Sequence, residues 1–216
     1  MDFSFLSDYY KFFLIGARNT IFISIFSVLF GTILGLILAL MKTSKNKVLK
    51  VISTAYVEFV RGTPLLIQLY IIYYGLPLNL PEIPSGILAL TLNSSAYVAE
   101  IVRSGIQSID IGQMEAARSM GMSEGMAMRY VIIPQALKNI IPALGNEFIT
   151  VIKESAIVSV IGVPELMYNS ETVTGNIFKP FEPLIVAALL YFALTFTLSK
   201  GLSKIEGRLR VVDKSV

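Results

Sequence analysis

The residues of this chain of 216 that could carry out covalent or metal chemistry are few, and neither histidine nor cysteine is among them. The run GMSEG at 121–125 matches the G-x-S-x-G pattern of a nucleophilic serine, but that pattern requires a histidine base. Lys153 and Ser155 leave a Ser–Lys pair formally open, although nothing orients it. Without histidine or cysteine, carboxylates are the one kind left of the usual ligands of zinc and other transition metals. We therefore predict no catalytic residue and no metal site.

Phosphate and nucleic-acid chemistry are also disfavoured by the sequence. No G-x-x-x-x-G-K-[ST] run occurs, so the chain cannot hold ATP by that route, and we expect no cofactor in it. The net charge is only +3, and no basic run interleaved with aromatic residues indicates nucleic-acid binding.

Polar side chains inside apolar stretches are the remaining candidates. Asn93, Tyr97 and Glu100 follow one another at i, i+4 and i+7 and so share a helical face. Glu147, Thr150 and Glu154 also share a helical face. Ionisable groups at membrane depth cost several kcal/mol and usually face a cavity or a partner. Hydroxyls, amides and carboxylates suit the ammonium group of a zwitterion, and the N-terminus of a broken helix suits its carboxylate. The predicted substrate-binding residues are Gln68, Asn93, Ser94, Tyr97, Glu100, Glu154 and Ser155.

Each of these residues has a plainer interpretation. Asn93 and Ser94 could serve hydrogen bonds between helices, and Glu100 could support the polar segment that follows it. Glu147 and Lys153 could be charges at the end of a helix, below the bilayer, where they cost little.

The elements that position these residues are predicted to be membrane helices. The composition is 54% hydrophobic and 15% charged, with a mean hydropathy of +0.69, which exceeds that of ordinary soluble domains. Residues 20–41 carry no charge over a length that crosses a bilayer. Further apolar stretches lie at about 51–76, 87–102, 140–163 and 184–198. We predict an all-α membrane protein with five spans, forming a single domain over residues 1–216.

The charges of the loops predict the orientation. Lysine and arginine concentrate at 42–50, at 103–138 and in the C-terminal tail, whereas the loops 75–86 and 164–183 are poor in cations. Because cations favour the cytoplasmic side, the N-terminus is expected outside and the C-terminus inside.

The second stretch is interrupted at RGTP, residues 61–64. Proline removes a backbone hydrogen bond, and broken helices at membrane depth are tolerated only inside protein or beside water. The interruption can be interpreted as part of a substrate path or as a feature of helix packing.

The polar segment 110–134 predicts two short helices on the cytoplasmic side. Asp110 is a candidate N-cap with Gln113 in a capping box, Gly121 ends the first helix, and Ser123 caps the second. Glu115 and Arg118 are spaced to form an ion pair. An amphipathic helix resting on lipid headgroups is the alternative.

The run EAARSMGMSEGMAMRYVIIP resembles the EAA signature of ABC importer permeases, with Val131 and Ile133 in its two aliphatic positions. Other blocks resemble the polar amino acid branch of that family, and they look closest to arginine, histidine and glutamine permeases. These blocks are GARNTIFIS (16–24), VEFVRGTPLLIQL (57–69), LNSSAYVAEIVRSGIQSI (92–109), PQALKNIIPALGNEF (134–148) and KESAIVSVIG (153–162).

The resemblance implies that the segment is a coupling helix between spans three and four, seated in a cleft of a separate ATPase subunit that holds ATP and magnesium. It also implies an extracytoplasmic amino-acid-binding protein, a second permease copy or homologue, and a location in the bacterial inner membrane. The function that it implies is the permease subunit of an ATP-driven importer of polar amino acids, which forms the substrate pathway, and carboxylates in that pathway would favour a basic amino acid. An ATP-independent carrier or channel is the alternative function. The predicted ATPase-coupling residues are Glu115, Ala116, Ala117, Arg118, Gly121, Met122 and Ser123.

Overall fold

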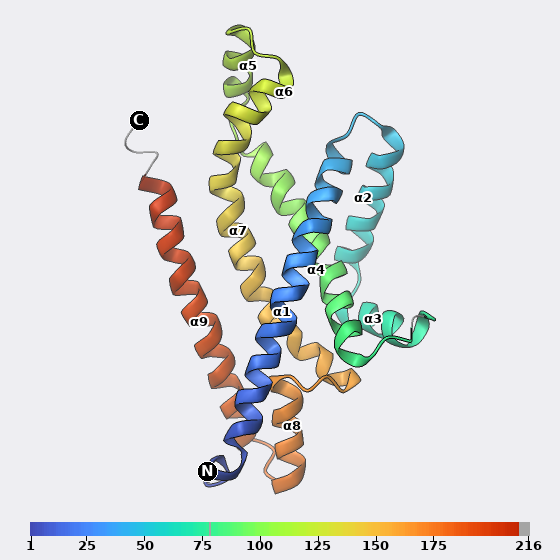
Figure 1. Cartoon of the computed structure of the whole chain (residues 1–216), viewed down its shortest axis with the longest axis vertical. Coiled ribbons are helices and arrows are strands. Elements are labelled where there is room, and N and C mark those ends of the chain that lie inside the picture. The colour runs from blue at the N-terminus through green and yellow to red at the C-terminus, as the bar shows by residue number, and fades with distance from the viewer. Residues whose placement is uncertain (78, 212–216) are drawn as a thin grey trace.

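The computed structural model describes residues 1–77 and 79–211, and every regular element in that part of the chain is a helix. The long helices α1 (Leu6–Thr43), α4 (Glu82–Gln107) and α9 (Glu182–Val211) run in one direction, and α2 (Lys47–Gly62) and α7 (Ile133–Glu154) run back (Figure 1). We call the end that carries α5 (Ile111–Ser119) and α6 (Glu124–Ala127) the α5 end. The opposite end, with the N-terminus and α8 (Leu166–Ile177), is the α8 end. The all-helical prediction is confirmed for the described residues.

Three helices of the described residues, α1, α4 and α9, are long and apolar enough to cross a membrane. The predicted first helix, residues 20–41, is too short and starts too far along the chain. Helix α1 has 38 residues and begins at Leu6, before the uncharged run. Its first turns carry Asp8, Lys11 and Arg18 among apolar residues, and Phe13 in these turns is buried. The packing of such turns on other helices, rather than their hydropathy, sets where α1 begins.

The two predicted cation-poor loops are partly helical, so treating them as loops throughout was wrong. Helix α4 already starts at Glu82, and α8 occupies the middle of 164–183. Leu166 and Val173 lie seven residues apart on one face of α8 and are buried with Phe5 and Phe13 of the N-terminal region. A short amphipathic helix of this kind lacks the hydropathy signal of a span.

The predicted break in the second apolar stretch is confirmed. Helix α2 ends at Gly62, and Thr63 and Pro64 are extended before α3 (Leu65–Tyr70) and a π-helical turn, Ile71–Gly75. Proline disfavours the helical conformation at the residue before it, in agreement with the φ of −119° and ψ of 144° at Thr63.

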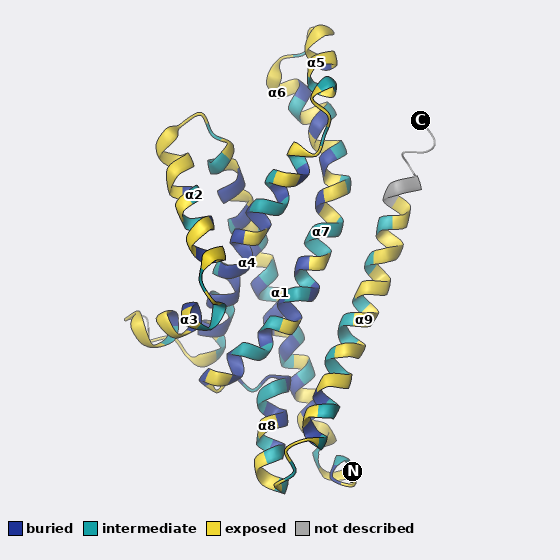
Figure 2. Ribbon diagram, turned by 180° about the vertical axis from the view of Figure 1, so that it is seen from behind, coloured by how far each residue is buried: buried dark blue, intermediate teal, exposed yellow. Residues whose placement is uncertain are grey.

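Helix α4 is the most buried of the three long apolar helices (Figure 2). In its most apolar window 67% of the residues are buried, against 33% in α1 and 6% in α9. Small residues allow the approach of α1, since a Cβ at Gly35 would lie 2.6 Å from the Cβ of Val98 and 2.8 Å from the carbonyl oxygen of Ser95. Helices α1 and α4 therefore pack through small residues, as membrane helices commonly do.

This close approach makes Gly35 intolerant of a side chain. We expect Gly35→Val to destabilise the fold by about 1–3 kcal/mol through overpacking and to lower the apparent Tm in mild detergent. The matched control is Gly175→Val in α8, where a Cβ meets open space. Equal Tm values for the two variants would contradict the proposed packing.

Candidate functional site

The segment 110–134 folds as two short helices joined by a glycine turn, at the α5 end (Figure 1). The Asp110 side chain accepts a hydrogen bond from the Gly112 N–H at 2.7 Å, and Ser123 Oγ accepts one from the Met126 N–H at 3.3 Å. Gly121 has a φ of +86°, in the left-handed region that favours glycine. Both predicted caps and the predicted turn are confirmed.

Two finer predictions about this segment were wrong. Gln113 Oε1 accepts a hydrogen bond from Gln135 Nε2 at 3.3 Å rather than completing a capping box. Arg118 Nη1 donates to the Met122 carbonyl at 3.0 Å, across the glycine turn, and the ion pairs of the described residues do not include Glu115 with Arg118. Arg118 thus holds the turn closed.

Most of the predicted coupling residues are exposed on this hairpin, and Ala117 is buried. The buried side of α5 rests on the π-helical turn Met128–Ile132, which leads directly into α7. Met120 and Met126 stand exposed on the outer surface, with 82% and 49% of their surfaces accessible. The exposed residues of the predicted set are Glu115, Ala116, Arg118, Gly121 and Ser123, and Met122 is half-buried.

Gln68 and Asn93 form a buried polar junction at the α2–α3 break. Gln68 Nε2 donates to the Val60 carbonyl at 2.8 Å and lies 3.1 Å from the Thr63 carbonyl, two acceptors left open where α2 ends. Asn93 Nδ2 on α4 donates to Gln68 Oε1 at 3.1 Å. These two predicted substrate-binding side chains are therefore engaged in joining the broken helix to α4.

Ser94 pairs with a carboxylate that the predicted set omits. Its Oγ donates to Glu147 Oε1 at 2.8 Å, between α4 and α7, and both side chains are buried. Reading Glu147 as a charge at a helix end was wrong, because it lies inside α7. Its spacing of seven residues from Glu154 was the available signal that it faces inward.

Glu100 lies among three cations near the α5 end. It contacts Lys42 of α1, Arg103 Nη2 at 2.8 Å and Arg61 Nη1 of α2 at 3.7 Å. The Arg61 guanidinium also lies 5.6 Å from the centre of the Tyr97 ring. This cluster ties α1, α2 and α4 together, and its three cations all lie outside the segment 110–134 that Glu100 was expected to support.

Glu154 lines a groove of about 530 Å³ towards the α8 end. Its neighbour Ser155 is buried, is not among the residues that line the groove, and donates a hydrogen bond to the Ile152 carbonyl at 2.8 Å. The groove is formed where α7, the 3₁₀ turn Ser155–Ile161, α8 and the start of α3 meet. Its lining residues are Leu65, Lys153, Glu154, Ala156, Ile157, Ser159, Val160, Met167 and Glu171.

Glu165 is fully buried and was missed by the sequence prediction. It accepts hydrogen bonds from the Tyr168 N–H at 2.7 Å, from Tyr191 Oη at 2.5 Å and from Thr20 Oγ1 at 3.3 Å. Burial raises the pKa of the Glu165 carboxyl, although these hydrogen bonds oppose the shift.

Asn19 Nδ2 donates to the Pro164 carbonyl at 2.7 Å, so the residues around Glu165 are fixed to α1. The sequence signal that could have indicated this buried site was Asn19 and Thr20, two polar residues at the start of an apolar run.

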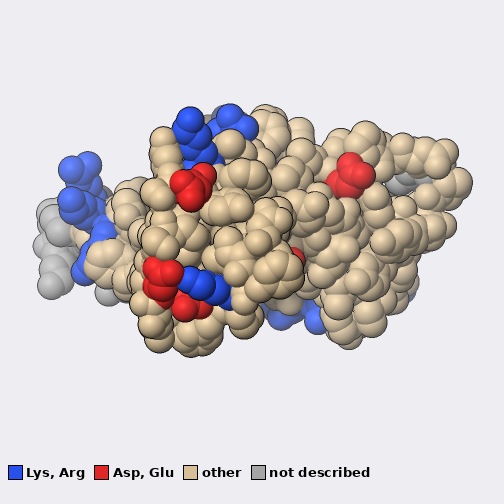
Figure 3. Space-filling model, turned by 90° about the horizontal axis from the view of Figure 1, so that it is seen from below, with Lys and Arg blue, Asp and Glu red and all other residues tan. Residues whose placement is uncertain are grey.

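Charged groups on the α8 end form small separate clusters on a mostly uncharged surface (Figure 3). Lys179 and Asp2 form an exposed ion pair, in which the Nζ and Oδ2 atoms lie 2.6 Å apart. The hydrogen bond from Lys179 lowers the pKa of the Asp2 carboxyl.

The junction at Gln68 yields a test of its role. We expect Gln68→Leu to cost about 1–3 kcal/mol, because the Val60 carbonyl and Asn93 lose their partner inside the protein. The apparent Tm in detergent should fall, whereas the exposed control Gln107→Leu should leave it within a degree or two. An unchanged Tm in Gln68→Leu would show that the side chain is free for another task, such as substrate binding.

Comparison with known proteins agrees with this arrangement. Residues 31–210 match the family model described as "Binding-protein-dependent transport system inner membrane component". The chain is 40% identical over 212 residues to the probable glutamine ABC transporter permease protein GlnM of Bacillus subtilis (strain 168), covering 97% of this chain and 98% of that protein. It is 41% identical over 217 residues to the arginine transport system permease protein ArtQ of the same strain, covering 99% of each.

A solved structure extends the likeness to three dimensions. It is described as the crystal structure of an amino acid ABC transporter with histidines, and it superposes with a TM-score of 0.94 at 51% identity, over 96% of this chain and 99% of that one. The chain therefore belongs to the family of binding-protein-dependent transport system inner membrane components, the permease subunits of ABC transporters.

Proposed function

We propose that this permease is the membrane subunit of an ATP-driven importer of polar amino acids, located in the bacterial inner membrane. The observation that carries the proposal is the exposed, capped helix–glycine–helix hairpin at one end of the bundle, in a chain without an ATP-binding motif of its own. The glutamine and arginine named for two relatives support a polar amino acid as the substrate. Transport then needs ATPase subunits from outside this chain.

The five predicted spans correspond to α1, α2 with α3, α4, α7 with its 3₁₀ turn, and α9, with the N-terminus outside and the C-terminus inside. The alternating direction of these elements supports this assignment (Figure 1). In this orientation the α5 end is cytoplasmic and α8 is external. An amino-acid-binding protein would deliver its ligand to the regions 75–86 and 164–183, and a second permease copy or homologue would complete the pathway.

The ATPase subunits dock on the hairpin from Asp110 to Pro134. Glu115 and Ala116 present an exposed face, and Met120 and Met126 supply adaptable apolar contacts. Ala117 points inward and holds α5 on the bundle. Because Arg118 is engaged at the turn, its role is to fix the turn rather than to contact the ATPase.

The contacts of the predicted substrate-binding residues reduce the number of candidates for the substrate path. Gln68, Asn93, Ser94, Glu100 and Ser155 all have partners within the protein. In the groove at Glu154, the carboxylates of Glu154 and Glu171 suit an ammonium group, and the ammonium of Lys153 suits a carboxylate. We assign this groove to the amino acid in transit.

The groove predicts a charge-dependent selectivity. In proteoliposomes with the complete transporter, Glu154→Gln should lower kcat/KM for arginine by roughly tenfold, the value of about one charged hydrogen bond. Uptake of glutamine should fall less. Glu58→Gln, an exposed change on α2, is the control. Equal effects on both amino acids would leave the permease as a conduit, with selection made by the binding protein.

The glycine turn predicts a loss of coupling. Gly121→Val places a β-branched residue at a φ of +86°, which should deform the hairpin without touching the spans. We expect the variant to insert normally but to recover far less ATPase on purification and to lose ATP-driven uptake. Gly121→Asn, which tolerates the left-handed region, should retain much more of both.

The alternative function makes the opposite prediction. An ATP-independent carrier or channel would keep its uptake when ATP is depleted and the proton gradient is held constant, and Gly121→Val would leave uptake unchanged. Either result would overturn the proposed coupling.

A further inference from the structure

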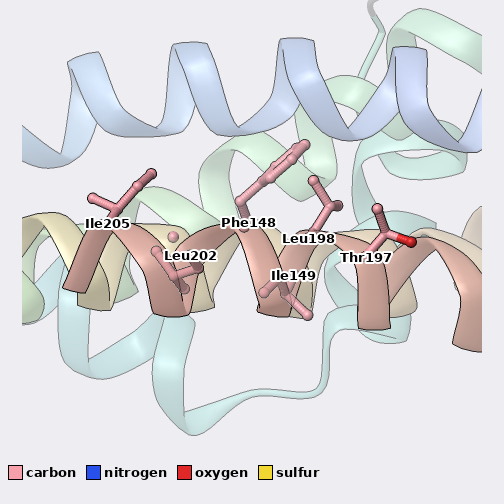
Figure 4. Close-up of a pocket in the computed structure, with 8 residues that line it drawn as sticks. Phe148, Ile149, Thr197, Leu198, Leu202 and Ile205 are labelled. Atoms are coloured by element: carbon pink, nitrogen blue, oxygen red, sulfur yellow. The ribbon is translucent and has the colours of Figure 1, made fainter. Parts of the chain in front are cut away.

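Helices α7 and α9 enclose an apolar groove that the proposed transport path does not use (Figure 4). It has a volume of about 310 Å³. Thr197 offers its one hydroxyl, which donates to the Ala193 carbonyl of its own helix at 2.7 Å. The lining side chains of the groove therefore offer no free hydrogen-bond donor to an amino acid or to water. Its lining residues are Gly145, Phe148, Ile149, Thr197, Leu198, Gly201, Leu202 and Ile205.

A close contact between Gly145 and Leu202 forms the floor of the groove, and Gly201 leaves its mouth open. A Cβ at Gly145 would lie 2.4 Å from Leu202 Cδ1, so the two helices meet there. A Cβ at Gly201 would meet nothing within 4 Å. The space above Gly201 is thus open, on a helix whose apolar window has only 6% of its residues buried.

A basic stripe borders this groove. Lys200, Lys204 and Arg208 are exposed and follow at i, i+4 and i+8, so they share one face of α9. Lys200 and Lys204 each precede a lining residue, Gly201 and Ile205, and so lie about 100° around the helix from it. Glu206, two residues after Lys204, falls about 160° away from it around the helix. One edge of the apolar groove therefore carries cations alone.

We propose that this groove binds one acyl chain of an anionic phospholipid from the bilayer, with the lipid phosphate held by Lys200, Lys204 and Arg208. The groove runs along α9 from Thr197 to Ile205, about 12 Å at 1.5 Å per residue. One leaflet of hydrocarbon is about 15 Å thick, so the groove covers most of the length of a single acyl chain. The cations select an anionic headgroup and not merely any lipid.

The absence of tryptophan from the chain allows a direct test. Phe148→Trp puts a single fluorophore into the groove of the full-length chain, which is reconstituted in phosphatidylcholine vesicles. Bromine-labelled phosphatidylglycerol should quench it at a mole fraction at least tenfold below that needed for bromine-labelled phosphatidylcholine. A reporter at Phe192→Trp, an exposed α9 position outside the groove, should show a smaller preference.

Matched variants separate the groove from the surrounding lipid. Gly201→Leu fills the groove and should abolish the preference at Phe148→Trp. Gly207→Leu, on the same helix with equally open space but outside the lining, should retain it. Lys200→Gln and Lys204→Gln should each weaken the preference by about fivefold.

Three outcomes would overturn the proposal. Equal quenching by both lipids would mean ordinary boundary lipid. Quenching by neither lipid, with cross-linking between α9 helices of two chains, would mean that a second copy covers the groove. A preference unchanged by Gly201→Leu would place the anionic lipid elsewhere.

Discussion

The structure depends on one constraint, that no backbone polar group in a membrane-spanning helix can be left without a partner. This chain interrupts its helices at Thr63–Pro64 and again at Gly162–Glu165, and each interruption frees backbone groups. Buried polar side chains then act as their partners. At the first break Gln68 donates hydrogen bonds to backbone carbonyls. At the second, Asn19, Thr20 and Glu165 form hydrogen bonds with backbone groups. These contacts satisfy backbone groups at the points where the chain leaves one helix and enters α3 or α8.

This constraint changes how polar residues at membrane depth are interpreted. Such residues are functional candidates by default, and the sequence selects Gln68, Asn93 and Ser94 on that ground. Their hydrogen bonds to Val60, to Gln68 and to Glu147 give each of them a structural task. The residues that we propose to meet a substrate are instead charged residues that line the groove at Glu154, namely Lys153, Glu154 and Glu171.

Local and long-range features differ in how far the sequence predicts them. The caps at Asp110 and Ser123 and the turn at Gly121 depend on residues within three positions, and the sequence predicts all of them. The bond between Asn93 and Gln68 spans 25 positions, and the one between Thr20 and Glu165 spans 145. Nothing in a single sequence indicates which distant residue satisfies a polar group. For the same reason α8 escapes prediction, since its helix is fixed by packing on α1.

The position of α7 connects the two proposed sites. The docking hairpin passes through the turn Met128–Ile132 into α7, and Glu154 ends that helix, so about 39 Å of continuous helix separates them. Between them Glu147 bonds to Ser94 of α4, the most buried of the long apolar helices. A displacement of the hairpin in the proposed transporter must either carry α4 along or break this buried hydrogen bond. Because the second course leaves a carboxylate unpaired at membrane depth, α4 and α7 are expected to move together.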